Sequence, residues 1–135
     1  MGLRYAYFPD HDLIVEQLDG DVELDQVKSV KLQEISSGDL GPKTVILCVV
    51  GDVTFDSRLT KEFAPWLREA YGDFDPRAAY LVRDPGATAL MMLLQRQFRD
   101  RGVEVFSTLS RALEWLGLDS KRITAADLQV GDVPE

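Results

Sequence analysis

An α/β fold with one mixed sheet is predicted by three features of this chain of 135 residues. Apolar runs at residues 3–8 and 13–18 flank a turn that contains Pro9, the pattern of an antiparallel hairpin. Residues 44–50, TVILCVV, form a continuous apolar run typical of a strand buried on both faces. Helical and strand-like segments alternate after it. We therefore expect about five strands, an N-terminal antiparallel hairpin and then parallel strands, between about four helices.

The segment after the hairpin, residues 22–35, is predicted to be a helix. Its residues Leu24, Val27 and Ile35 suit one helix face, although apolar residues near its middle also suit the alternation of a strand. Gly20 lies just before this segment and breaks the second hairpin strand. The predicted order at this point is therefore strand, strand, helix and then the buried strand.

The second half of the chain continues this alternation. Apolar residues recur at helical spacing over residues 59–71, where Pro65 indicates either a helix that begins there or a kinked one. Residues 78–82 are predicted to be a short strand. Asp84 followed by Pro85 is the signature of an N-cap and a first helical position, so the next helix begins here.

The C-terminal part is predicted to hold one more strand and helix. Residues 103–106 form the strand, and Ser107 or Thr108 caps the helix after it. Thr124 with Asp127 three residues later predicts a capping box and one further helical turn.

Length and composition exclude several classes of protein. We expect one domain over residues 1–118, with a partly ordered tail over residues 119–135. One cysteine, Cys48, and one histidine, His11, supply neither an intramolecular disulfide nor a zinc site, and Cys48 is expected to be a buried core thiol. The 15 basic and 23 acidic residues give a net charge of −8, which disfavours binding to nucleic acid and to anionic lipid. Without an apolar stretch long enough to span a membrane, we expect a cytoplasmic protein.

The closing segment VEVFSTLSRALEWL, residues 103–116, and the N-terminal hairpin followed by Gly20 resemble the STAS domain superfamily. Within it, they resemble the bacterial SpoIIAA-like branch, which includes anti-sigma factor antagonists. The resemblance covers residues 3–118 and rests on element order and this one motif. It implies a non-enzymatic regulatory or protein-interaction module.

Anti-sigma factor antagonists carry a phosphorylatable serine after the buried central strand, and the resemblance places Ser57 at this position. Asp56 and Ser57 match the Asp-Ser of the family pattern, whereas Arg58 and Leu59 stand where the family has Ser and Gly. Phosphorylation would add about −1.5 to −2 charges and repel an acidic partner surface. The alternative is that Ser57 only caps a helix.

The loop around Ser57 is the expected partner-binding surface. Its candidate residues are Asp52, Thr54, Asp56, Arg58 and Thr60. Together with Asp73, Asp75 and Asp84, the aspartates of this loop predict one acidic rim of the sheet. A partner that docks on this rim is expected to present a basic surface and to bind less well at high salt.

A second functional hypothesis concerns Met91 and Met92, which lie in a helical segment that is apolar around much of its circumference. Members of the SpoIIAA-like branch are similar in fold to CRAL-TRIO lipid carriers. The alternative function is therefore a carrier or sensor of a small apolar ligand, or self-association at Met91 and Met92.

An enzyme is the least favoured class. Asp52, Asp56 and Asp84 follow parallel strands and could together hold Mg²⁺, but capping of loops by aspartate is the favoured explanation. The chain has no nucleotide-binding glycine motif and no nucleophile paired with a base, so we expect no catalytic residues, no metal and no cofactor.

Overall fold

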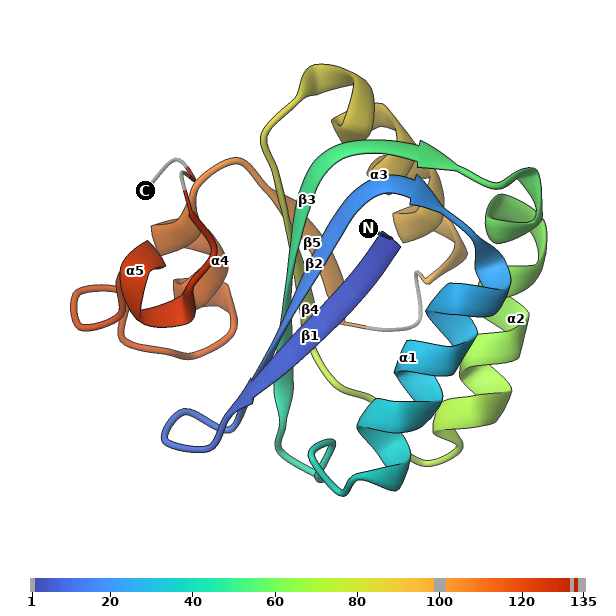
Figure 1. Ribbon diagram of the computed structural model, residues 1–135. Coiled ribbons are helices and arrows are strands. Elements are labelled where there is room, and N and C mark those ends of the chain that lie inside the picture. The colour runs from blue at the N-terminus through green and yellow to red at the C-terminus, as the bar shows by residue number, and fades with distance from the viewer. Residues whose placement is uncertain (1, 99–101, 132, 134–135) are drawn as a thin grey trace.

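Five strands form one sheet in the computed structural model of the chain, which describes residues 2–98, 102–131 and 133 (Figure 1). The strands lie in the order in which they occur in the chain, and the first pair is antiparallel whereas the others are parallel. They are β1 (Gly2–Phe8), β2 (Leu13–Val22), β3 (Val45–Phe55), β4 (Ala78–Val82) and β5 (Val103–Phe106). This mixed α/β sheet confirms the predicted fold class.

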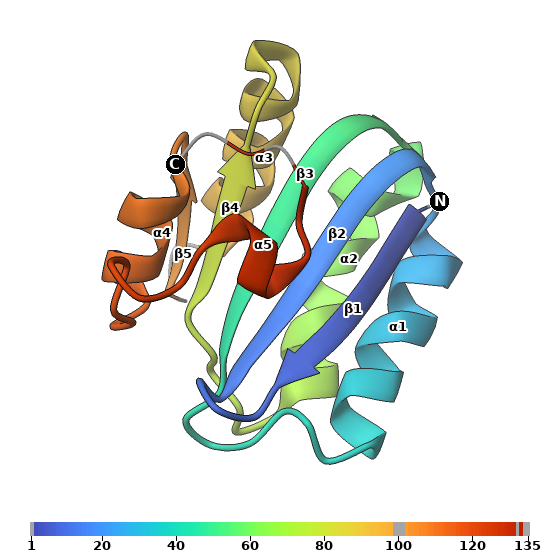
Figure 2. The ribbon, with the colours of Figure 1, turned by 60° about the vertical axis from the view of Figure 1, so that its left-hand side comes forward.

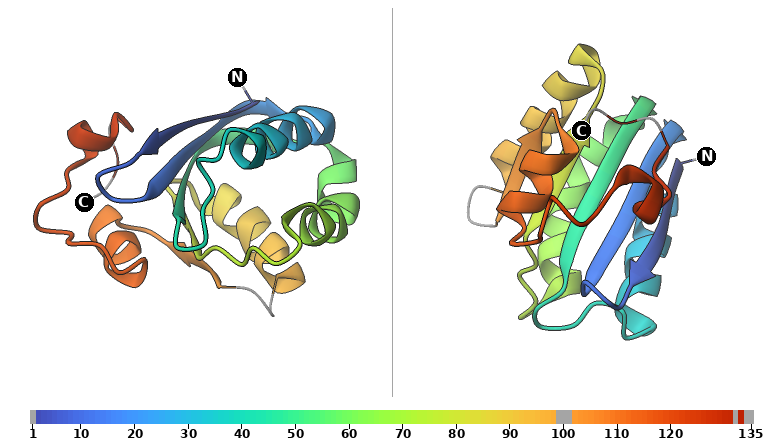
Figure 3. Two further views of the ribbon diagram at one scale, coloured as in Figure 1. Left: turned by 90° about the horizontal axis from the view of Figure 1, so that it is seen from below. Right: turned by 90° about the vertical axis from the view of Figure 1, so that its left-hand side faces the viewer.

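The helices divide unequally between the two faces of the sheet (Figures 1 and 3). Each parallel crossover moves one strand further in the same direction, and right-handed crossovers that all move in one direction place their helices on the same face. This crossover face carries α1 (Leu24–Ser36), α2 (Ser57–Tyr71) and α3 (Pro85–Gln97). The opposite face, here called the terminal face, is covered by α4 (Leu109–Trp115) and α5 (Ala125–Leu128), which follow the last strand.

Strands β2 and β3 are longer than the sequence predicts. The expected strands end at residues 18 and 50, whereas the two strands continue side by side until Val22 pairs with Phe55. The pairing shifts its register between Leu18 and Gly20, so the glycine marks an irregularity within β2 rather than its end. This extension carries the start of α2 beyond the ends of β4 and β5.

The predicted helix starts are largely confirmed. Residues 24–36 are helical, which decides between the two alternatives for that segment. Helix α2 begins at Ser57 and continues through Pro65, so the proline lies inside the helix and not at its first turn. Asp84 caps α3 by accepting a hydrogen bond from the backbone N–H of Ala87, and Pro85 occupies the first turn.

Each face of the sheet has its own core, because side chains alternate along the strands. On the crossover face, the large aromatic side chain Phe63 stacks on Trp66 and meets Phe98 edge-on. On the terminal face, the buried core side chains that the structure describes are apolar. They are Leu13, Val15, Leu47, Val49, Ala79, Leu81, Leu109, Ala112, Leu113, Leu116, Ile123, Ala125, Leu128 and Val130.

The segment after residue 118 contributes to the terminal core (Figure 2). The predicted capping box is confirmed: the Thr124 hydroxyl accepts from the N–H of Asp127, and the Asp127 carboxylate accepts from the N–H of Thr124. Leu128 and Val130 are buried against the sheet. Residues 132, 134 and 135 of the predicted tail lie outside the described residues.

Within the described ranges, the helices are too short and too polar to cross a lipid bilayer.

Candidate functional site

Asp56 joins the beginnings of two helices at the carboxyl end of β3. Its Oδ1 accepts a hydrogen bond from the N–H of Arg58 at 3.0 Å, in the first turn of α2, and its Oδ2 accepts from the N–H of Leu24 at 3.3 Å, at the start of α1. Both bonds stabilise the ionised carboxylate, and they hold the pKa of Asp56 below its ordinary value. One side chain therefore fixes how α1 and α2 enter the crossover face.

Ser57 is the first residue of α2 and is exposed. The alternative in which Ser57 itself caps the helix is wrong, because Asp56 occupies the N-cap position. The carbonyl oxygen of Ser57 accepts a hydrogen bond from the Thr60 hydroxyl at 3.0 Å. Its own hydroxyl forms no hydrogen bond with the part of the chain that the structure describes, and it faces solvent.

The other predicted partner-binding residues surround Ser57, and we call Asp52, Thr54, Asp56, Ser57, Arg58 and Thr60 the β3–α2 corner. They do not form one loop as expected, because Asp52 and Thr54 belong to the extended part of β3. Arg58 lies 3.5 Å from a carboxylate oxygen of Asp25 on α1 and 3.3 Å from one of Glu62 on α2. The corner therefore combines exposed acidic and hydroxyl side chains with one paired arginine.

The prediction of one acidic rim is wrong in part. Asp52, Asp56 and Asp84 follow or end parallel strands, but Asp73 and Asp75 lie between α2 and β4, at the amino end of the sheet. The reason is topological, since a helix that returns antiparallel to its strands delivers the next loop to the opposite edge. Across the described residues, no three His, Cys, Asp or Glu side chains come together in a group that could hold a metal ion.

Met91 and Met92 do not share one surface. The Met91 side chain is fully buried in the crossover core, whereas Met92 on the same helix is 51% exposed. The exposed side chain has Leu93 as its neighbour, at 49% exposure. The space beside Met91 measures about 30 Å³, which is room for about two water molecules.

A buried group of charged side chains lies between the sheet and α1, and the sequence analysis did not predict it. Lys31 on α1 donates from its Nζ to Glu16 Oε2 on β2 at 2.5 Å and to the Tyr71 hydroxyl on α2 at 3.3 Å. Glu34, one helical turn after Lys31, brings its Oε1 to 3.6 Å from the same Nζ. We call Glu16, Lys31 and Glu34 the buried triad; their exposed fractions are 2%, 5% and 0%.

Two carboxylates share one ammonium group in this triad, and their protonation differs as a result. Burial alone would raise the pKa of Glu16, but the charge of Lys31 and the hydrogen bonds to this carboxylate together outweigh it and hold this pKa below its ordinary value. Burial would likewise lower the pKa of Lys31, yet the acidic groups around it, Glu16 first among them, together keep it well above the usual range. Burial and the negative charge of Glu16 raise the pKa of Glu34 to about 10, so Glu34 is protonated at neutral pH.

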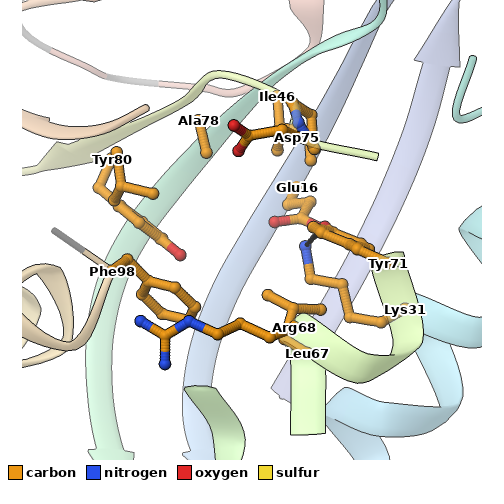
Figure 4. A pocket seen from close by; sticks show the side chains of 12 residues that line it. Glu16, Lys31, Ile46, Leu67, Arg68, Tyr71, Asp75, Ala78, Tyr80 and Phe98 are labelled. Atoms are coloured by element: carbon orange, nitrogen blue, oxygen red, sulfur yellow. Dashed lines mark hydrogen bonds and ion pairs between the residues drawn. The ribbon is translucent and has the colours of Figure 1, made fainter. Parts of the chain in front are cut away.

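Two small cavities meet at the triad. Each measures about 30 Å³, and both are lined by Glu16, Lys31 and Tyr80. The first opens toward the amino end of β4 and is also lined by Tyr71, Arg68 and Asp75, as Figure 4 shows. Cys48 lines the second cavity as a buried thiol, as predicted, and burial holds its pKa well above the ordinary value.

These groups favour binding over acid–base chemistry. Lys31 keeps its proton and Glu16 stays ionised, and burial raises the pKa of Tyr71 to about 12. A general acid or base works best with a pKa close to the operating pH, and the pKa values of Lys31, Glu16 and Tyr71 are shifted away from neutrality.

The sequence did contain a signal for the triad. Glu16 interrupts the apolar run of β2, and a buried charge requires a partner. The buried stripe of α1 is Leu24, Val27, Lys31 and Glu34, so charged residues continue the helix face that its first two apolar residues define. Ile35, which the sequence analysis assigned to this face, is only partly buried.

Comparison of the chain with protein-family models, with curated proteins and with solved structures finds no match. The class that the structure itself defines is an α/β protein with one mixed five-stranded sheet. The resemblance to the STAS superfamily stays a prediction.

Proposed function

We propose that this chain is a regulatory protein-interaction module of the SpoIIAA-like STAS type, which docks its partner at the β3–α2 corner and is switched by phosphorylation of Ser57. The observation that carries the proposal is the position of Ser57. Its hydroxyl is exposed at the first residue of α2, next to the carboxylate of Asp56 that holds the starts of two helices. The element order with an N-terminal hairpin also supports it.

The electrostatics of the corner provide the means of switching. Arg58 is the cation nearest in sequence to Ser57, and its partners Asp25 and Glu62 lie on two different helices. A phosphoryl group on Ser57 would compete with these carboxylates for the guanidinium group and would add about −1.5 to −2 charges to an acidic corner. Phosphorylation would therefore repel a partner whose docking surface is acidic. It would strengthen the binding of a partner whose docking surface is basic.

The experiment is phosphorylation in a cell extract with ATP, read by the intact mass of the recovered protein. The matched control is Ser36→Ala, which removes another exposed helical serine far from the corner. We expect wild type and Ser36→Ala to gain one phosphate and Ser57→Ala to gain none. An unmodified wild type, or a phosphate that persists in Ser57→Ala, overturns the proposal.

A further inference from the structure

The cavity at the amino end of β4 has the features of a binding site. It lies between α2, the end of α3 and the crossover face of the sheet, at the opposite end of the parallel strands from Ser57. Apolar side chains, among them Ile46, Leu67 and Phe98, form most of its wall. A few polar side chains converge on it, the combination that small-molecule sites typically show.

The hydrogen-bonding groups in this wall are not all used. Lys31 donates to Glu16 and to Tyr71, so its ammonium group is committed within the protein. The Tyr80 hydroxyl forms no hydrogen bond with any residue that the structure describes. In Figure 4 this hydroxyl and one carboxylate oxygen of Glu16 both point into the cavity. The wall thus presents a donor, the Tyr80 hydroxyl, and an acceptor, the Glu16 carboxylate, to the same space.

A donor beside an acceptor is complementary to a hydroxyl group, which both accepts and donates. The buried charges around this space are already balanced, since Glu16 pairs with Lys31 and Glu34 carries a proton. Arg68 and Asp75, also in the wall, are one cation and one anion, and Arg68 already donates to the carbonyl oxygen of Gln97. An ionised ligand would therefore lose its hydration without meeting a net opposite charge, which is costly. The wall therefore selects for an uncharged molecule.

Arg68 forms the movable part of the wall. Its guanidinium group lies 5.8 Å from the centre of the Phe98 ring, and it donates a hydrogen bond to the carbonyl oxygen of Gln97. As it stands the cavity holds about 30 Å³, which is enough for about two water molecules. The arginine side chain is partly exposed and rotatable, so its displacement toward solvent enlarges the cavity without moving the backbone.

We propose that this cavity binds a small uncharged alcohol or phenol, whose hydroxyl group accepts a hydrogen bond from Tyr80 and donates one to Glu16 while its apolar body lies against Phe98 and Leu67. The site is separate from Ser57, and its test does not depend on the proposed phosphorylation.

Phenol is a suitable probe because it is uncharged at pH 7 and small. We expect a saturable shift of the backbone amide signals of Ala78 and Tyr80 in two-dimensional NMR, with a dissociation constant on the order of millimolar. Anisole, which cannot donate, should bind about 2- to 10-fold more weakly. Benzoate and benzylamine, one anion and one cation, should give no saturable shift. Absence of saturation with phenol, with the cavity holding water only, overturns the proposal.

The variant that tests the donor is Tyr80→Phe, which removes a hydroxyl without a protein partner and keeps the ring. It should bind phenol about 2- to 10-fold more weakly than wild type. The matched control is Tyr7→Phe, which removes a hydroxyl that bonds to Asp12 on the hairpin, and it should bind phenol like wild type. Equal affinity of Tyr80→Phe and wild type overturns the proposal. If Tyr80→Phe does not fold, the comparison of phenol with anisole on the wild type decides.

Discussion

The two faces of the sheet bury different kinds of side chain. The described side chains that are buried in the terminal core are apolar, from Leu13 on β2 to Val130 after α5. The crossover face is also mainly apolar, but it buries Glu16, Lys31 and Glu34, and two small cavities are both lined by Glu16 and Lys31. Neighbouring residues of one strand contribute to the two different cores, since Val15 and Glu16 point to opposite faces of the sheet.

The terminal face mainly stabilises the fold, whereas the crossover face contains the polar groups of the proposed ligand site. Apolar burial on the terminal face contributes about 25 cal/mol for each Å² removed from water. A buried ion pair gives little net stabilisation, because the loss of hydration offsets the attraction between the charges, whereas removal of one partner is expensive. The crossover face therefore packs less tightly around a polar centre. Of the two hydrogen-bonding groups of the proposed ligand site, Glu16 belongs to that centre and Tyr80 lines the cavities beside it.

The largest expected effect comes from removing the single cation of the triad. Lys31→Met should lower the free energy of unfolding by about 3–5 kcal/mol, because Glu16 is then buried without a counter-ion. Urea denaturation at pH 7 measures it. Glu16→Gln is the control and should cost less, since Glu34 can then ionise and pair with Lys31. A Lys31→Met protein as stable as wild type would show that the charges are not buried together.

An apolar truncation on the terminal face should come next. Leu113→Ala removes a fully buried side chain of α4, at an expected cost of about 3 kcal/mol. Since no titratable side chain belongs to that core among the described residues, this cost should be the same at pH 6 and pH 9. A cost that changes with pH would mean that the two cores are coupled through the sheet.

The smallest expected effect, when taken per pH unit, is the dependence of the free energy of unfolding on the protonation of Glu34. Its pKa is about 10 in the folded chain, against an ordinary value of 4.5, so between these values the folded state holds a proton that the unfolded state has released. The stability of the wild type therefore falls as pH rises, by at most about 1.4 kcal/mol per unit from this group.

Glu34→Gln replaces this carboxyl with a neutral group of similar shape and should flatten the decline, so that the variant gains on wild type between pH 6 and pH 9. Thermal and urea unfolding over this range measure the difference. Identical pH profiles for the two proteins would place an ionised Glu34 in the folded state.

Much of the fold was predictable because it depends on local patterns. The turn at Pro9, the apolar run of β3, the Asp84–Pro85 start of α3 and the Thr124–Asp127 capping box are all visible within a few residues. The ends of β2 and β3 were not, because each strand is extended by pairing with the other as far as Val22 and Phe55.

The candidate sites divide in the same way. Ser57 was found from a short motif, and the structure adds that Asp56 is the cap and that its carboxylate reaches Leu24, 32 positions earlier in the chain. Lys31 and Glu16 are 15 residues apart on different elements, and Tyr71 is a further 40 residues from Lys31. A charge in an apolar run indicates that a partner exists, but does not identify it.

By itself, the sequence determined the fold class and most of the element starts, because hydrophobic periodicity and capping residues act over one or two helical turns. Only the tertiary structure decided which face each helix covers, that Asp73 and Asp75 lie away from Asp52, and that one lysine serves two carboxylates. These outcomes depend on the direction of the crossovers and on side chains brought together from distant segments. The free energy that fixes them arises when the layers pack and water is excluded from between them.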